Sequence, residues 1–447
     1  MMFPPEPRNA TRRCPLRSTE AEPLPRPDPQ HTPGRNSPWE WLRRLHGPLA
    51  PVEIAPGVRV WLTLTYEATA QALCSPTLSN DPRHWEEFHS GRVGEAGLLP
   101  LTAPRDNALT SDGETHRRRR APLVDGLAKL TARGMGQEIT AITDRLIDSF
   151  IERGHADLIG EFATRLPILV LSRAYGLSDG NGLRLAELAS RFWDCDPATA
   201  DPAAAELEAF FAELTARARR WPGEDLASWM ITHPSRLSET EIRHGLMSYI
   251  AAGNDLTAHL IANTLVELLA DPAPERGPVL SHVDVGRAVR RACRVRPPLR
   301  VWPARYAIQD TDIAGVRIGA GEGVAIGFEP AHEDPALAHH VEDAEHTLLT
   351  WGAGTHTCPA RSLAWEITEQ GVTAVLRRLR EPRLALRVEE LRPRPGPLLN
   401  AFDALPVRFV PGRPASATRA LGPGRPARPR PRRRGKGRAW LTRWWCH

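Results

Sequence analysis

The spacing of apolar residues divides the chain into a long patterned centre and two flanks without a regular pattern. Apolar positions recur at helical spacing through most of residues 135–271, which favours long amphipathic helices. Alternating apolar residues around turn-forming glycines at 52–73 and 306–327 indicate short strands. The segment LPVRFV at 405–410 is expected to close the edge of a sheet. The pattern predicts a mostly α (α+β) fold, with a large helical domain and a smaller β-rich region.

Both flanks are rich in proline, arginine and glycine and lack hydrophobic periodicity. Residues 1–37 and 411–447 are therefore predicted to be disordered, because they cannot bury enough apolar surface to offset the entropy of ordering. Residues 411–447 carry eleven Arg or Lys and no acidic residue, which leaves 47 basic against 53 acidic residues in the rest of the chain. Tryptophans in this basic tail allow contact with nucleic acid or an anionic membrane. A disordered Arg/Pro-rich extension is the stronger interpretation, so no nucleic-acid partner is expected, and the folded domain is predicted to span 38–410.

Six cysteines are scattered along the chain, with no CxxC pair and no dense framework. This spacing is typical of a reducing compartment rather than of a small disulfide-stapled secreted domain. No apolar run is long enough for a signal peptide or a membrane span. We therefore expect a cytoplasmic protein.

One predicted helix is unusually long. It opens with a capping box formed by Ser238 and Glu241 and stops before Pro272. Roughly 32 residues at 1.5 Å each span about 48 Å, so this helix is expected to cross the core. Polar residues interrupt its apolar middle at 253–257, and buried polar groups need partners or a purpose. The alternative interpretation is a tolerated kink.

The stretch WGAGTHTCPAR at 351–361 places a cysteine directly before an apolar helix. Gly352 and Gly354 permit positive φ angles, so the chain can bend tightly in front of Cys358. A thiolate is a strong ligand for soft metals when its loop supplies N–H donors to its charge. A lone cysteine at this position is more often a small buried hydrophobe.

This loop resembles the haem-binding loop of the cytochrome P450 superfamily, Phe-Gly-x-Gly-x-His-x-Cys-x-Gly. Both first glycines, the histidine and the cysteine match, with Trp351 for the phenylalanine and Ala360 for the last glycine. The resemblance implies the cytochrome P450 fold with a long central helix, and haem b (iron protoporphyrin IX) bound through the Cys358 thiolate. Gly352 and Gly354 would shape the loop around the iron ligand.

Other motifs of this superfamily follow in the right order. The pattern DGETHRRRR places His116 and Arg120 one helical turn apart, and the resemblance implies that both bind a haem propionate. By the same resemblance Arg305 meets the other propionate and His356 makes a further contact. Arginine suits a carboxylate because its fork donates two parallel hydrogen bonds. The intervening arginines, 117–119, are expected to be a solvated face.

The long helix carries Ala-Gly-Asn-Asp-Leu-Thr at 252–257, which resembles the superfamily's oxygen-activating motif. The resemblance implies that Asp255 relays protons to bound dioxygen. The position after the acid, where the superfamily has a hydroxyl, holds Leu256. Thr257 is therefore a weaker second candidate, since it lies about 100° further round the helix.

Two departures concern an ion network of this superfamily. Its Glu-x-x-Arg motif appears here with Arg291 in place of the glutamate, although Arg294 is retained. The arginine expected in the following segment, 336–350, is missing. Because an unpaired buried charge is costly, we hypothesise a reversed network in which carboxylates of that segment pair with Arg291 or Arg294. The candidate partners are Glu342, Asp343 and Glu345. A solvated helix face, or a destabilised protein, is the alternative.

Arginines at 287, 290, 291 and 294 line one face of the same helix. The resemblance implies that this face is near the surface where acidic ferredoxins dock, so Arg287 and Arg290 are candidate contacts for such a partner.

The resemblance implies monooxygenation of a small hydrophobic substrate with O2 and electrons from NAD(P)H through a ferredoxin system. Two alternatives stay open: a peroxide-dependent or non-oxidative haem protein, motivated by Leu256, and a binding or partner protein without turnover, motivated by Arg291. Segments 84–103 and 170–200 are the expected pocket walls, and apolar residues in the first of them suit a pocket entrance or a core equally well.

Overall fold

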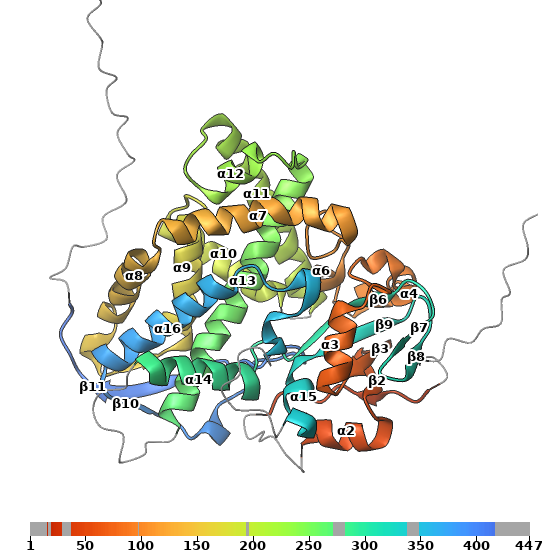
Figure 1. Cartoon of the computed structure of the whole chain (residues 1–447). Coiled ribbons are helices and arrows are strands. Elements are labelled where there is room, and N and C mark those ends of the chain that lie inside the picture. Colours follow the sequence, from red (N-terminus) through yellow and green to blue (C-terminus); the bar gives the residue numbers. More distant parts are fainter. Residues whose placement is uncertain are drawn as a thin grey trace, which may run out of the picture. The chain divides into compact units, whose positions relative to one another are not determined.

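The computed structural model describes residues 16, 19–28, 37–96, 98–193, 196–270, 282–337 and 348–415 (Figure 1). Its helices are α2 (Pro38–His46), α3 (Tyr66–Cys74), α4 (Glu86–His89), α5 (Arg92–Glu95), α6 (Leu99–Thr102), α7 (Gly113–Ala132), α8 (Gly136–Asp148), α9 (Arg165–Ala174), α10 (Asp179–Phe192), α11 (Pro197–Arg220), α12 (Leu226–Thr232), α13 (Glu239–Leu269), α14 (His282–Val295), α15 (Phe328–His332) and α16 (Arg361–Arg378). Its strands are β1 (Glu22–Pro23), β2 (Leu49–Ala55), β3 (Val58–Thr63), β4 (Leu78–Ser79), β5 (His155–Asp157), β6 (Val301–Ala307), β7 (Thr311–Ile313), β8 (Val316–Ile318), β9 (Gly323–Gly327), β10 (Arg380–Leu384) and β11 (Pro406–Val410). The mostly α expectation is confirmed.

The two predicted β segments join in one sheet of strand order β1-β2-β3-β9-β6-β4. Strand β3 pairs in parallel with β9, and Trp61 lies opposite Val324. This pairing joins chain segments about 260 residues apart and fixes the β-rich region next to α3 and α15 (Figure 1).

Strand β11 corrects the expectation that 405–410 closes a sheet edge. It is the central strand of a three-stranded sheet, β10-β11-β5. Val407 pairs with Leu384 on one side and with Ala156 on the other. Both Val407 and Phe409 are buried, so the strand belongs to the core rather than to a rim.

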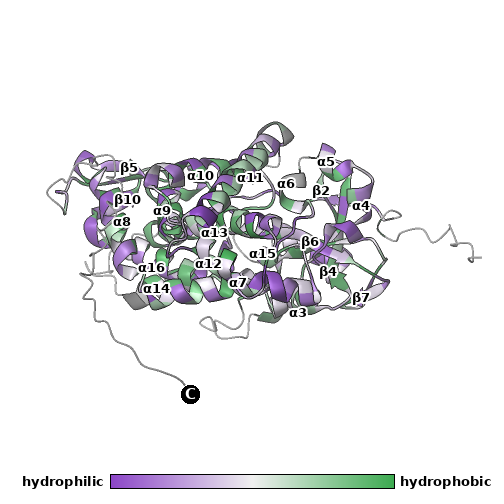
Figure 2. Ribbon diagram, turned by 90° about the horizontal axis from the view of Figure 1, so that it is seen from above, coloured by the Kyte–Doolittle hydropathy of each residue, from purple (hydrophilic) through white to green (hydrophobic). Residues whose placement is uncertain are grey.

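The central helix α13 has 31 residues and passes through the middle of the helical region, in contact with α9, α10, α11, α14 and α16 (Figure 1). The predicted capping box is present: the Ser238 hydroxyl accepts from the Glu241 N–H at 3.1 Å, and a Glu241 carboxylate oxygen accepts from the Ser238 N–H at 2.8 Å. Helices that cover the core, such as α14 and α16, show hydrophobic and hydrophilic stretches together (Figure 2). Among the described residues, no helix is both long and apolar enough to cross a membrane.

Part of the N-terminal flank is structured, which corrects the expectation of disorder throughout 1–37. Strand β1 pairs in parallel with β2, and the Leu24 N–H donates to the Glu53 carbonyl at 3.1 Å. Leu24 is 7% exposed and belongs to the core. A short apolar anchor therefore orders residues that composition alone assigns to a disordered flank. Residues 416–447 lie outside the described part of the chain.

The arginine run on α7 is not simply a solvated face. The Arg118 and Arg119 guanidinium groups both donate to the Glu241 carboxylate of α13, with the Arg119 Nε at 2.9 Å from Oε1. Only Arg117 keeps to the surface, where it pairs with Glu114. Two arginines thus hold α7 against the start of the central helix.

The Glu241→Gln substitution is expected to destabilise the protein at neutral pH and much less at acidic pH. Burial alone would raise the pKa of Glu241, but bonds from Arg118, the Ser238 backbone and Arg119 outweigh it and lower the pKa to about 2. Because the pKa of Glu241 is lowered in the folded protein, its carboxylate stabilises the fold fully above the ordinary pKa of 4.5. This contribution is lost as the pH falls toward 2. We expect E241Q to lose roughly 2 kcal/mol of unfolding free energy at pH 7 and little near pH 2. Urea unfolding of both proteins across this range checks it, and a loss independent of pH would contradict it.

Candidate functional site

The cysteine loop is built from two tight turns. A 3₁₀ turn over Leu349–Trp351 ends at Gly352, whose φ is +72°, and Gly354 has φ +67°. The Cys358 N–H then donates to the Trp351 carbonyl at 2.8 Å. These angles confirm the expected positive φ at both glycines and place the cysteine just before α16.

Backbone and guanidinium groups surround the Cys358 sulfur. Burial raises the pKa of the Cys358 thiol above its ordinary value, and the N–H groups of Ala360 and Arg361 and the guanidinium groups of Arg120 and Arg361 offset only part of that rise. Such donors and cations are what a sulfur needs to carry negative charge. These donors and cations would stabilise the thiolate once a metal ion takes the place of the proton.

A cavity of about 310 Å³ lies between the cysteine loop and α13. Cys358, Gly352 and His356 of the cysteine loop and Thr257 of α13 are among the residues that line it. Much of the remaining lining is apolar: Leu101, Leu123, Leu171, Trp193, Leu256, Leu260, Leu299, Trp302 and Phe328. The cavity therefore combines a cysteine sulfur with a largely hydrophobic lining.

Two arginines from distant segments reach the same cavity. Arg120 of α7 donates to the Thr357 carbonyl of the cysteine loop. Arg305 of β6 is 4% exposed and donates to the Asn80 side-chain oxygen. Burial lowers the pKa of Arg305 to about 10, so it remains a cation at neutral pH. The structure thus brings together both arginines that the sequence singled out.

The rings of His116 and His356 lie against each other at a tilt, and His356 lines the cavity. Their ring centroids are 4.0 Å apart, and the His356 Nε2 lies 3.5 Å from a carboxylate oxygen of Asp112. Burial is the main cause that lowers the pKa of His116 to about 4, with His356 and Arg120 adding to it. His116 does not line the cavity, and its Nε2 is buried without a hydrogen-bond partner among the described residues.

The charge of the cavity fits a dianionic ligand. The described residues that line it include three arginines, Arg105, Arg120 and Arg305. No Asp or Glu is among these lining residues. A lining with this excess of positive charge attracts an anionic ligand. A haem group has two carboxylates, and the Cys358 sulfur on the cavity wall is of a kind that can bind its iron, so the residues present fit haem.

Helix α13 shows how the motif at 252–257 is arranged. Gly253, Leu256 and Thr257 line the cavity, and the Thr257 hydroxyl donates to the Gly253 carbonyl at 2.6 Å. Asp255 is 2% exposed and does not line the cavity. Its Oδ1 pairs with the Arg394 Nη1 at 3.3 Å, a partner that sequence reasoning missed because it follows 139 residues later.

The predicted pocket segments contribute only some of the walls. Leu101 comes from 84–103, and Leu171 and Trp193 come from 170–200. Trp85, in contrast, is fully buried and stacks on Tyr306 with ring centroids 5.1 Å apart. It is a core residue rather than part of a pocket entrance.

Arg291, which replaces the glutamate of the superfamily's ion network, has a partner on α13. The Arg291 Nε lies 2.7 Å from a Glu267 carboxylate oxygen, and the arginine side chain is 64% exposed. An exposed pair of this kind contributes little stability. The segment that was expected to supply partners, with Glu342, Asp343 and Glu345, lies outside the described residues.

The chain is similar in sequence to known proteins over most of its length. No protein-family model matches the chain. It is 30% identical over 391 residues to the cytochrome P450 monooxygenase PikC of Streptomyces venezuelae, covering 83% of this chain and 90% of that protein. It is 26% identical over 393 residues to 2-hydroxy-5-methyl-1-naphthoate 7-hydroxylase of Streptomyces carzinostaticus, covering 84% of this chain and 95% of that protein.

A solved structure agrees with these relatives. CYP154C4 from Streptomyces sp. W2061 superposes with a TM-score of 0.77 at 26% identity, covering 87% of this chain and 98% of that one. Members of the family carry haem and use dioxygen. Together with a cavity that fits haem, this shows that the chain belongs to the cytochrome P450 family of monooxygenases.

Proposed function

We propose that the protein inserts one oxygen atom from O2 into a small, largely apolar organic molecule, with Cys358 as the thiolate ligand of haem b. The observation that carries this proposal is one cavity whose lining unites the cysteine, the buried Arg305, the half-buried Arg120 and many apolar side chains, including several from α13. Haem, when bound, would supply the oxygen chemistry, and a thiolate ligand from Cys358 would favour cleavage of the O–O bond.

In this proposal the basic residues hold the propionates. Arg120, supported by His116, binds one carboxylate, and Arg305 with His356 binds the other. Asp112 anchors this set because its carboxylate accepts from Ser79 and Asn80 at 2.5 and 3.1 Å and lies beside His356. Gly352 and Gly354 keep the backbone turned so that the Cys358 sulfur faces the cavity.

We assign proton supply to Asp255 and Thr257. Asp255 is held on the side of α13 away from the cavity by Arg394, so its route inward needs either water or movement of that ion pair. The Thr257 hydroxyl is on the cavity wall, bonded to the Gly253 carbonyl, and can pass a proton to a water in the chamber.

The test is the absorption spectrum of the reduced, haem-loaded protein with and without carbon monoxide. A Soret band at the red-shifted, thiolate-ligated position supports the proposal. A band at the imidazole or neutral-thiol position, or failure to bind haem, would overturn it.

A second candidate function is peroxide-driven oxidation, which the apolar Leu256 on the cavity wall favours. A hydroxyl at that position would help to deliver protons, and Leu256 has none. Product formed with hydrogen peroxide but not with reduced ferredoxin would favour this candidate. Product formed with ferredoxin and little peroxide release would exclude it.

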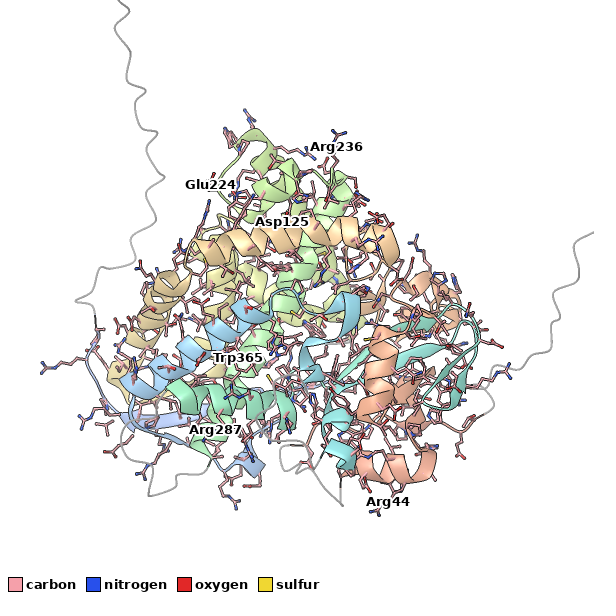
Figure 3. The ribbon with its side chains drawn as sticks, viewed as in Figure 1. Arg44, Asp125, Glu224, Arg236, Arg287 and Trp365 are labelled. Carbon is pink, nitrogen blue, oxygen red and sulfur yellow. The ribbon has the colours of Figure 1, made fainter. Side chains whose placement is uncertain are left out.

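We further propose that electrons from NAD(P)H arrive through an acidic ferredoxin that docks on α14. Arg287 is exposed on this helix, and Trp365 lies on the neighbouring α16 (Figure 3). Helix α16 begins three residues after Cys358, so this surface is close along the chain to the proposed iron ligand. A positive surface steers an acidic partner by long-range attraction.

The Arg287→Glu substitution is expected to slow ferredoxin-supported reduction several-fold at low salt, and the difference should shrink as ionic strength rises. Reduction by dithionite should be unchanged, because it needs no docking. Stopped-flow reduction measures both rates. Arg236→Glu is the matched control, because that exposed arginine lies beside α12, far from Arg287 (Figure 3). Equal rates for R287E and the wild type would contradict the proposed surface.

A further inference from the structure

Tyr249 of α13 is a buried polar side chain that the family motifs do not explain. It is 9% exposed and lines the cavity. Its hydroxyl has no hydrogen-bond partner among the described residues. A second tyrosine in this region, Tyr175 at the C-cap of α9, differs, because its hydroxyl donates to the Leu246 carbonyl at 3.1 Å and it does not line the cavity.

The surroundings of Tyr249 belong to the proposed haem site. Burial raises the pKa of Tyr249 well above its ordinary value, Tyr175 and Cys358 raise it further, and Arg120 lowers it. The phenol is therefore a protonated donor at neutral pH. The charged groups that act on it are the proposed iron ligand and an arginine assigned to a propionate.

A buried hydroxyl without a partner costs about 1–3 kcal/mol. Native structures rarely keep such a group unless a ligand or ordered water completes it. Among the described residues that line the cavity, none is acidic, so the protein itself offers no carboxylate to this donor. A ligand carboxylate next to Arg120 would satisfy both groups at once.

We propose that the Tyr249 hydroxyl donates a hydrogen bond to the haem propionate that Arg120 holds. This assignment rests on the proposed haem site and adds to it a donor from the central helix. Because Tyr249 lies one turn before Gly253 and on the same helix face, it couples the position of α13 to the edge of the haem. Withdrawing the donor leaves more negative charge on the propionate, which lowers the reduction potential of the iron.

The experiment is a two-by-two comparison of protein and haem. Wild-type and Tyr249→Phe proteins are each loaded with haem or with haem dimethyl ester, whose propionates are esterified. Transfer to excess apomyoglobin then gives the rate of haem loss. We expect haem to leave Y249F about tenfold faster than the wild type. With the ester, which lacks the carboxylate, the two proteins should release haem at nearly equal rates. The midpoint potential of haem-loaded Y249F should fall below that of the wild type.

Tyr175→Phe is the matched control, because it removes a buried phenol hydroxyl next to the site without touching the cavity. It should lower thermal stability and leave haem loss and potential unchanged. Equal haem loss from Y249F and the wild type, or the same ratio with both haems, would overturn the Tyr249 assignment while leaving the haem proposal standing. A wild-type protein that binds no haem would overturn the proposed function and this assignment with it.

Discussion

The Cys358→Ser variant is expected to lose the red-shifted Soret band of the carbon monoxide complex completely. Serine has nearly the same shape as cysteine, so the loop with Gly352 and Gly354 should keep its fold. Its hydroxyl does not ionise at neutral pH and is a poor ligand for iron, whereas a thiolate is a strong ligand for soft metals, and N–H donors and cations near the Cys358 sulfur offset part of the effect of burial. Monooxygenase turnover should be lost with the band.

Cys293→Ser is the control for this experiment. Cys293 is fully buried on α14 and does not line the cavity, and burial raises the pKa of its thiol to about 12. C293S should therefore retain the thiolate-type band and lose only stability. An unchanged spectrum in C358S, or loss of the band in C293S alone, would show that Cys358 is not the ligand.

The Arg300→Met variant is expected to be the most destabilised single substitution on this side of the fold. The Arg300 Nε lies 2.8 Å from a Glu329 carboxylate oxygen, and the two side chains are 3% and 4% exposed. Arg300 also donates to the Pro25 carbonyl at 2.8 Å and lies over the Trp39 ring. Removing one partner leaves the other charge buried, which costs about 3–5 kcal/mol. Chemical denaturation measures the loss.

The double variant Arg300→Met/Glu329→Met separates a buried unpaired charge from simple loss of packing. Replacing both charges with apolar groups of similar size should recover most of the stability. Asn400, which donates to both Glu329 and the Pro297 carbonyl, keeps the second of these bonds. If the double variant is as unstable as R300M, the cost comes from the contacts to Pro25 and Trp39 instead. The Arg300–Glu329 pair stabilises the β-rich side of the fold. In the same fold, Arg291 occupies the position where the superfamily's Glu-x-x-Arg motif has its glutamate.

Local signals in the sequence determined the parts of this protein whose residues are close along the chain. Patterns of four residues or fewer predict three of these features: the capping box at Ser238, the length of α13 and the turns at Gly352 and Gly354. Hydrogen bonds and backbone angles at that range depend on neighbouring residues alone. The cysteine motif likewise sufficed to identify the family. Motifs of the same kind singled out Arg120 and Arg305, and the structure places both on the wall of one cavity.

Tertiary structure alone decided which distant residues meet. The Arg394 partner of Asp255, the Glu329 partner of Arg300 and the central position of β11 depend on segments that the chain brings together from far apart. Composition likewise failed for residues 19–28, because pairing of β1 with β2 buries Leu24 and orders a proline-rich segment. Charge pairs and buried donors such as Tyr249 carry no periodicity. Their partners are fixed by packing, which a linear pattern does not contain.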